Sequence, residues 1–235
     1  MPRRAVRSAT WAVGSRIAGS RSRGRSASSS GPSTTTAGGG RPSTRPVGTW
    51  RSSARSAEED RRAPAGATNL PAPDILRVAE RYRDLLELGD QMGVVPQVEV
   101  WGFSATLGRL GEAALVAMES GHPRACILHD VYHLYKGGSR LRGLEFLEGS
   151  AMHLFHMNDY PADPPRAAIN DAHRVYPGDG VAPLRRILRT LRDNGYRGML
   201  SLELFNRDYW RQDALTVART GLEKMRAVVR ESLAR

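Results

Sequence analysis

The sequence places one potential metal ligand at the end of each of four short apolar segments. These segments read QVEVWG, CILHD, HLFHMND and LSLELF, and the residues concerned are Glu99, Asp130, His156 and Glu203. Three carboxylates and one imidazole suit a divalent ion such as Mn²⁺, Mg²⁺ or Co²⁺, with Zn²⁺ as a further candidate, better than they suit a thiolate-bound structural zinc. A divalent ion held in this way polarises substrate oxygens, so the predicted chemistry is metal-assisted.

The stretch MHLFHMNDYP contains two histidines, and only one of them can reach such an ion. Side chains alternate between the two faces of a strand, so His153 and His156, three residues apart, lie on opposite faces. His156 ends the apolar run and shares its face with Asn158. A lone histidine at a strand end is commonly just a hydrogen-bonded polar residue. The prediction for His156 therefore depends on the other three ligands.

Strand-like and helix-like segments, which must position these ligands, alternate along the chain from about residue 73. Helical periodicity covers residues 73–93, 105–123, 181–195 and 213–234, and a weaker helical pattern covers 139–150. The β-rich runs cover residues 94–103, 124–130, 151–156 and 198–205. Residues typical of helix boundaries support this division: Asp74 and Pro183 at helix starts, and Gly93, Gly121 and Gly195 at helix ends.

The four strand–helix alternations predict a parallel sheet with helices packed against it. In such folds the chemistry collects at the carboxyl ends of the strands, which is where the four predicted ligands lie. Adjacent strands are about 4.8 Å apart, so four side chains reach one ion only if the strands curve around it, as they do in a barrel.

Five motifs resemble one known family. VEVWG, ILHDVYHLYKGG, LFHMNDYP, RVYPGDG and GYRGMLSLELF follow one another as in the sugar phosphate isomerase/epimerase family, the xylose isomerase-like TIM barrels. The resemblance covers residues from about 64 to 230 and only the C-terminal half of that fold. It implies an α/β fold in which residues 64–235 form the C-terminal half of a (β/α)₈ barrel, with about four βα units. It also implies the same four metal ligands.

The resemblance further implies an activity and roles for particular residues. Glu99 and Glu203 would transfer the proton as well as bind the metal, and His133 and Arg174 would contact substrate oxygens. Packing in a loop for His133 and a surface salt bridge for Arg174 are the alternatives. Trp101, beside Glu99 in EVWGF, would form an aromatic wall for the substrate, with core packing as its alternative. The implied function is a metal-dependent isomerase or epimerase of a small sugar, sugar phosphate or keto-polyol, acting through an enediolate.

Three other functions compete with this prediction. The same fold and metal in a lyase similar to inosose dehydratases would eliminate a hydroxyl group. An apurinic endonuclease needs a three-zinc cluster and several more histidines at strand ends, and the chain has six histidines in all. A non-catalytic, truncated remnant is the third alternative, because a (β/α)₈ barrel takes about 250 residues and about 165 resemble the family.

The formal net charge of +11 belongs to the first 57 residues, which contain eleven arginines and no acid. The rest of the chain holds 24 basic and 24 acidic side chains, so no basic folded face predicts a specific nucleic-acid partner. No apolar run approaches the ~20 residues that span a bilayer. The single cysteine, Cys126, lies in an apolar run and fits a reducing compartment, so we expect a cytoplasmic protein whose partner is a small molecule.

Residues 1–63 are rich in Arg, Ser, Gly and Pro, and we expect them to form a disordered, low-complexity tail. A mitochondrial transit peptide is an alternative. The abrupt join near RRAPAGATNLPAP favours a truncated gene or an N-terminus translated in a shifted frame. Half of a barrel would leave its first and last strands with open edges and expose an apolar inner face, which favours a homo-oligomer.

Overall fold

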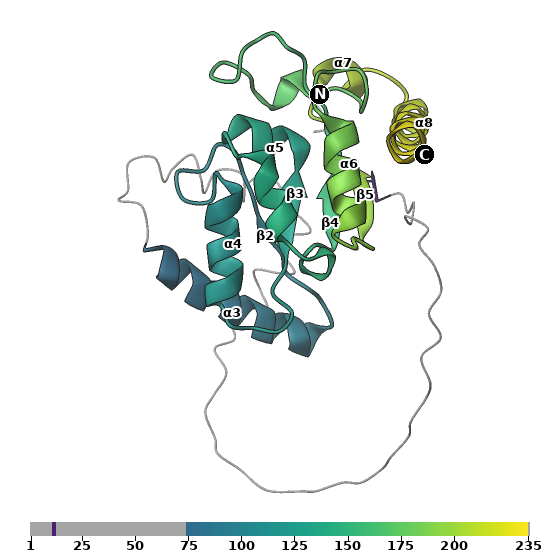
Figure 1. The fold of residues 1–235 in the computed structure, drawn as a ribbon. Helices are drawn as coiled ribbons and strands as arrows, with labels where there is room; N and C mark the ends of the chain where they lie inside the picture. Colours follow the sequence, from purple (N-terminus) through teal and green to yellow (C-terminus); the bar gives the residue numbers. More distant parts are fainter. Residues whose placement is uncertain (1–10, 13–73, 235) are drawn as a thin grey trace, which may run out of the picture. The chain divides into compact units, whose positions relative to one another are not determined.

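The computed structural model describes Trp11, Ala12 and residues 74–234 (Figure 1). The predicted tail and any βα unit before residue 64 therefore lie outside the described residues, apart from Trp11 and Ala12. The strands are β1 (Trp11–Ala12), β2 (Val98–Glu99), β3 (Ile127–Asp130), β4 (Leu154–His156) and β5 (Met199–Leu202). The α-helices are α3 (Ile75–Met92), α4 (Leu110–Glu119), α5 (Val131–Lys136), α6 (Leu184–Asp193), α7 (Arg207–Trp210) and α8 (Ala214–Leu233). Short 3₁₀ helices are η2 (Leu141–Phe146), η3 (Gly149–Ala151) and η4 (Asp171–His173).

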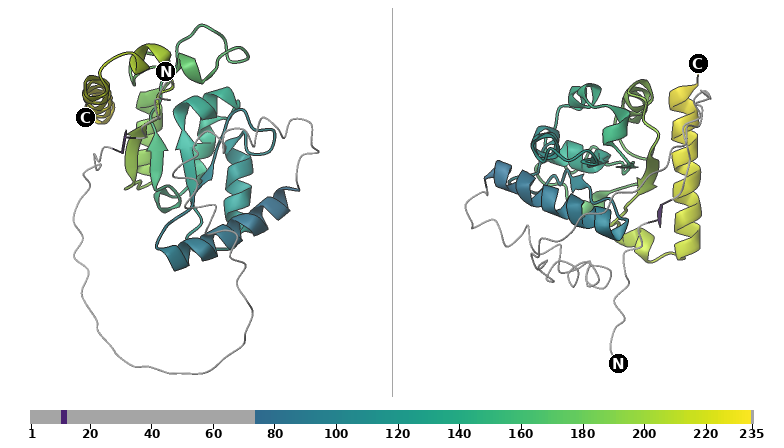
Figure 2. Two further views of the ribbon diagram at one scale, coloured as in Figure 1. Left: turned by 180° about the vertical axis from the view of Figure 1, so that it is seen from behind. Right: turned by 90° about the horizontal axis from the view of Figure 1, so that it is seen from below.

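Four parallel strands form the centre of the described fold. β2, β3, β4 and β5 are neighbours in that order, and in register Asp130 pairs with His156, which pairs with Ser201. Figure 1 shows α4, α5 and α6 on one face of these strands, and Figure 2 shows α3 and α8 as the two long outer helices. Each parallel strand is followed by at least one helix, so the prediction of four βα units in a parallel sheet is confirmed.

The outer edge of β5 differs from the prediction. Trp11 and Ala12 pair antiparallel with Leu202 and Ser201, so this part of the last strand is not an open edge. The signal for a strand there is weak, because the apolar run TWAVG is short and lies within arginine-rich sequence.

The helix boundaries carry the capping residues that the sequence predicts. The Asp74 side chain accepts a hydrogen bond from the backbone N–H of Leu76 at 3.0 Å, which satisfies a free donor of the first turn of α3. Gly93 ends the same helix with φ of 68°, a left-handed conformation in which a side chain would be strained. Pro183 precedes α6, and Gly195 follows it with φ of 75°.

The segment after β3 differs in part from the prediction. α5 begins directly at Val131, where no helix is predicted, and the weak helical pattern over 139–150 corresponds to the two 3₁₀ helices η2 and η3. Asp130 makes the early start favourable because its Oδ1 accepts from the N–H of Tyr132 at 2.8 Å. Gly143 and Gly149 lower the helix propensity of the later segment. α7 was missed as well, since four residues are too few for a periodic pattern.

The core lies between the sheet and its helices, and α6 illustrates how the sequence builds it. Its buried residues are Leu184, Ile187, Leu188 and Leu191, spaced as one helical face, while arginines occupy the opposite face. Phe155 of β4 and Leu200 of β5, both fully buried, belong to the same cluster. Across the described residues, no helix combines the length and the apolar character needed to cross a membrane.

Leu191→Ala tests this assignment of the core. Leu191 is fully buried, so the substitution is expected to lower the free energy of unfolding by about 2–5 kcal/mol, measured by urea denaturation. Leu215→Ala in α8 is the control, because Leu215 is 57% exposed and its truncation should cost less than about 0.5 kcal/mol. Similar losses for the two variants would show that the buried face of α6 is assigned wrongly.

Candidate metal centre

Three of the four predicted ligands converge at the carboxyl ends of the parallel strands. Glu99 ends β2, His156 ends β4 and Glu203 follows β5, and one ligand atom from each lies within 4.8 Å of the other two. His156 is only 4% exposed, and neither of its ring nitrogens has a hydrogen-bond partner. Burying a polar group without a partner costs free energy of folding. A cation bound by Glu99 and Glu203 would give a ring nitrogen of His156 such a partner.

Asp130 lies beside this group but is not one of its three members. Its Oδ2 is 3.6 Å from Nδ1 of His156, too far for a hydrogen bond. That oxygen accepts from Nδ2 of Asn158 at 2.6 Å and from a terminal nitrogen of Arg174 at 3.2 Å, while Oδ1 caps α5. The structure thus brings Asp130 to the predicted place, and its role as a ligand stays a prediction.

Arg174 is the buried counter-charge of these carboxylates. One terminal nitrogen lies 3.2 Å from Oδ2 of Asp130, 3.3 Å from Oε2 of Glu203 and 3.0 Å from the Glu203 carbonyl oxygen. The other donates to Oδ1 of Asp171 at 2.5 Å. The guanidinium also lies against the rings of Tyr132 and Phe205, at 4.6 and 4.9 Å from their centroids. At 1% exposure, Arg174 is not the surface salt bridge of the alternative interpretation.

The loop that carries Arg174 is shaped by the buried carboxylate of Asp159. Val175, the next residue, exchanges backbone hydrogen bonds with Asp159 in both directions, at 3.1 and 3.0 Å. The Asp159 side chain accepts from the backbone N–H groups of Tyr160, Gly178, Gly180 and Ala182. The motif RVYPGDG therefore wraps around one carboxylate, and this arrangement fixes the backbone next to Arg174.

His133 is buried in α5 and faces both Arg174 and the segment after β2. Its Nδ1 accepts from the N–H of Gly102 at 3.2 Å, and its Nε2 lies 2.9 Å from the second terminal nitrogen of Arg174. Burial lowers the pKa of His133 to about 4, so the ring is neutral and has one acceptor nitrogen. If Nδ1 accepts from Gly102, Nε2 carries a proton and faces the Arg174 donor. In that tautomer the Nε2–H of His133 and an N–H of Arg174 face each other, and neither can accept a hydrogen bond from the other.

Trp101 lies close to His133. Its ring is 6.4 Å from the His133 ring and 5.6 Å from that of Phe103, between centroids. Trp101 is half-buried. Its position beside His133 agrees with an aromatic wall, and its direct contact with substrate stays a prediction.

The crowding of acidic groups perturbs their protonation. Burial, with the charges of Glu203 and Asp130, raises the pKa of Glu99 to about 7. For Asp130, burial acts in the same direction, but Arg174 and the histidines outweigh it and hold its pKa well below the usual range. For His156, burial opposes the charged form, yet the carboxylates of Asp130, Glu203 and Glu99 raise its pKa. The raised pKa values of Glu99 and His156 show that the crowded carboxylates favour a bound positive charge, here a proton.

The other histidines of the sheet lie outside the group. His153 precedes β4 and is exposed, whereas His156 ends β4 and is buried. That the two histidines lie on opposite faces of one strand stays a prediction. His129 is buried in β3 and stacks on Phe155, with 5.7 Å between the ring centroids. Neither supplies the additional strand-end histidine that a three-zinc cluster needs.

Some residues of the site could not have been found from the sequence. Tyr132, Phe205, Asp159 and Asp171 act on Arg174 or on its loop, and their spacing carries no signal for this. Asn158 was noted only for sharing a face with His156. Its side chain links Asp130 to Glu203, a contact between strand ends that no local pattern records.

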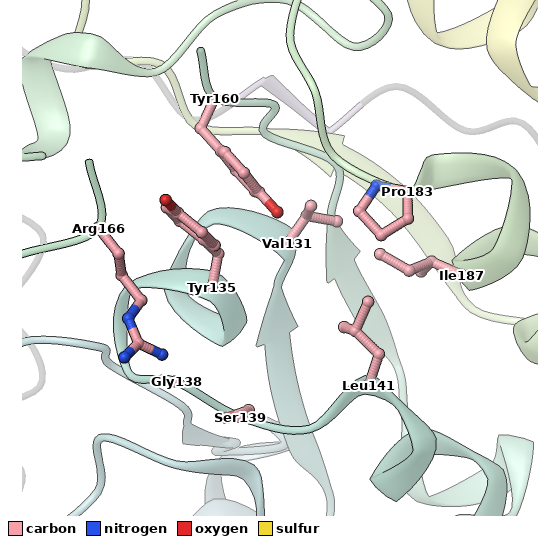
Figure 3. A pocket seen from close by; sticks show the side chains of 9 residues that line it. All are labelled: Val131, Tyr135, Gly138, Ser139, Leu141, Tyr160, Arg166, Pro183 and Ile187. Carbon is pink, nitrogen blue, oxygen red and sulfur yellow. The ribbon is translucent and has the colours of Figure 1, made fainter. Parts of the chain in front are cut away.

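A cavity of about 150 Å³ lies apart from the metal group. Figure 3 shows the rings of Tyr135 and Tyr160 side by side at its edge, with Arg166 nearby and an apolar floor that includes Val131, Leu141 and Ile187. The two tyrosine rings stack at 4.0 Å. None of the predicted ligands lines this cavity, so it does not belong to the metal centre.

Parallel βα units with an acid–histidine group at the carboxyl ends of the strands define a barrel-type α/β protein. Residues 57–228 match the family described as the xylose isomerase-like TIM barrel. The chain belongs to this family, as its motifs predict.

Curated proteins with similar sequences include inosose isomerases of two bacteria. The chain is 29% identical over 151 residues to that of Bacillus licheniformis, which covers 64% of this chain and 54% of the relative. It is also 29% identical over 147 residues to that of Halalkalibacterium halodurans, covering 62% and 52%. The chain thus spans about half the length of the curated relatives it matches.

Solved structures show the same fold. The IolI protein with a bound zinc atom matches with a TM-score of 0.63 at 23% identity, covering 67% of this chain and 57% of that protein. An L-ribulose 3-epimerase matches with a TM-score of 0.55 at 16% identity, covering 70% and 58%. At these identities the likeness concerns the fold alone.

The raised pKa of Glu99 predicts a pH-dependent stability. Folded Glu99 keeps its proton up to pH about 7, whereas unfolded Glu99 loses it near its ordinary pKa of 4.5. Between these values the folded state binds more protons, so this residue lowers stability as pH rises. Glu99→Gln is expected to gain stability relative to wild type across the window, on the order of 1–3 kcal/mol.

Urea denaturation of chelator-treated protein at pH 5 and pH 8 measures this difference. Glu119→Gln, at the exposed end of α4, is the control and should keep a constant difference from wild type. An equally constant difference for Glu99→Gln would contradict the raised pKa.

Proposed function

We propose that the chain is a metal-dependent isomerase or epimerase of a small sugar or keto-polyol. The observation that carries the proposal is the convergence of Glu99, His156 and Glu203, with the buried nitrogens of His156 left unpartnered. The names of the relatives, inosose isomerase and L-ribulose 3-epimerase, support a substrate of this class. A sugar phosphate stays a further candidate substrate of this proposal.

Glu99, His156 and Glu203, with Asp130 as the fourth donor, would hold the divalent ion. Mn²⁺, Co²⁺ and Mg²⁺ suit three carboxylates and one imidazole, and the zinc of the IolI structure makes Zn²⁺ a further candidate. When bound, such an ion would polarise the carbonyl and adjacent hydroxyl oxygens of an α-hydroxy ketone and so acidify the C–H bond between them.

Glu99 and Glu203 are the groups that would move the proton. One carboxylate takes the proton from the substrate carbon, and a second group returns it to the neighbouring carbon or to the other face. The two side chains reach the same point from strands at opposite ends of the parallel set, β2 and β5. Beside a bound cation both carboxylates would stay ionised, which is the form that takes up a proton.

His133 and Arg174 would hold the substrate oxygens. A substrate oxygen accepting from Nε2–H of His133 and an N–H of Arg174 would relieve the contact between these two donors. The same donors would stabilise negative charge that develops on that oxygen. Trp101 would cover one side of the substrate with an apolar surface.

The proposal also covers the compartment and the oligomeric state of the protein. The buried single cysteine fits a reducing compartment, so we place the protein in the cytoplasm. A half-barrel also favours association, so we propose that the chain forms a homo-oligomer.

Proton exchange with solvent tests the proposed chemistry directly. The purified chain, loaded with Mn²⁺ and incubated with an inosose in D₂O, is expected to replace the hydrogen next to the carbonyl with deuterium, as measured by mass spectrometry. Glu203→Gln should slow this exchange by about 10²–10⁴, the usual contribution of a positioned acid–base group.

The matched control is Glu223→Gln, an exposed glutamate of α8, which should exchange at the wild-type rate. No exchange above the metal-only background by the wild-type chain, with inososes or with simple ketoses, would overturn the proposed activity. Equal rates for Glu203→Gln and wild type would instead remove Glu203 from the mechanism.

A further inference from the structure

Asn158 joins the strand ends on either side of β4. It lies two residues beyond His156, and its Nδ2 donates to Oδ2 of Asp130, at the end of β3, at 2.6 Å. Its Oδ1 accepts from the backbone N–H of Glu203, directly after β5, at 2.8 Å. Asn158 is fully buried, so neither hydrogen bond competes with bulk water. One amide therefore connects two predicted metal ligands and follows a third.

The chemistry of its partners fixes the orientation of this amide. An ionised carboxylate only accepts hydrogen bonds and a backbone N–H only donates them, so Nδ2 must face Asp130 and Oδ1 must face Glu203. Aspartate has the same shape but no donor for Asp130. Leucine also has a similar shape, but it leaves the N–H of Glu203 without an acceptor and removes one of the two donors to Oδ2 of Asp130. Asparagine is thus the side chain of this size that fits both contacts.

The two links restrict both ligands. The backbone of Glu203 is held at its N–H by Asn158 and at its carbonyl oxygen by Arg174. The carboxylate of Asp130 is held at Oδ1 by the N–H of Tyr132 and at Oδ2 by Asn158 and Arg174. Arg174 attracts both carboxylates through its charge, and this attraction depends only weakly on their orientation. Asn158 supplies the directional contacts that fix where Asp130 and the backbone of Glu203 lie.

We propose that Asn158 is a positioning residue of the metal centre, which sets the spacing of Asp130 and Glu203 and thereby the affinity for a divalent ion. This inference rests on the proposed function, because it takes the strand-end residues as metal ligands. Replacing a residue that hydrogen-bonds to a metal ligand typically costs about 10–100-fold in metal affinity. The same range is expected for Asn158.

Titration calorimetry of the chelator-stripped chain with MnCl₂ tests the inference. Asn158→Leu and Asn158→Ser both break the two links, one keeping the shape and the other keeping polarity. Each is expected to weaken Mn²⁺ binding by about 10–100-fold. Asn194→Ser is the matched control, because Nδ2 of Asn194 donates to the carbonyl oxygen of Leu144 at 2.6 Å, away from the metal group. It should lose stability and keep the wild-type affinity for Mn²⁺.

Three results are distinguishable. Weaker Mn²⁺ binding by both Asn158 variants, beyond any change in Asn194→Ser, supports the inference. Wild-type affinity in the Asn158 variants, together with a lower unfolding temperature, would make Asn158 a purely structural residue and overturn the inference while leaving the proposed function intact. Absence of Mn²⁺ binding by the wild-type chain would overturn the proposed function, and this inference with it.

Discussion

The buried guanidinium of Arg174 is the interaction on which the rest of the site depends. Asp130 and Glu203 lie close together at one edge of the sheet, with Glu99 nearby, and like charges at such distances repel one another. Arg174 lies within 3.3 Å of carboxylate oxygens of Asp130 and Glu203 and so offsets this repulsion. Removing one partner of such a buried group leaves uncompensated charge, at a cost of about 3–5 kcal/mol. The positions of Asp130 and Glu203 therefore depend on the position of Arg174.

The sheet and the segments that follow its strands both position the residues of this site. A parallel sheet brings the ends of β2, β3, β4 and β5 to one edge, which is why residues more than 100 positions apart in the chain meet there. The segments that follow the strands then fix individual groups. Asp130 is also the cap of α5, Asn158 links it to Glu203, and Asp159 shapes the loop that holds Arg174. Each polar residue at the edge thus has a structural partner as well as its proposed role.

The sequence predicts features that depend on residues close together in the chain better than features that depend on contacts between distant segments. Helix boundaries at Asp74, Gly93 and Gly195 depend on neighbouring residues, so local patterns identify them. The convergence of His156 with Glu99 and Glu203 could be predicted because parallel strands bring their carboxyl ends to a common edge. The link from Asn158 to Glu203 and the aromatic rings around Arg174 depend on contacts between distant segments. α5 was missed because its start is set by one hydrogen bond to Asp130, and not by periodicity.

Metal binding by His156→Ala tests the central claim most directly. His153→Ala is the matched control, since His153 lies on the same segment of chain but on its exposed face. The account predicts that the wild-type chain and His153→Ala bind one Mn²⁺ or Zn²⁺ per chain in titration calorimetry. His156→Ala should bind more than about 100-fold more weakly, because losing a ligand costs more than losing a residue that supports one. Equal affinities of His156→Ala and wild type would contradict the assignment of this edge of the sheet as a metal centre.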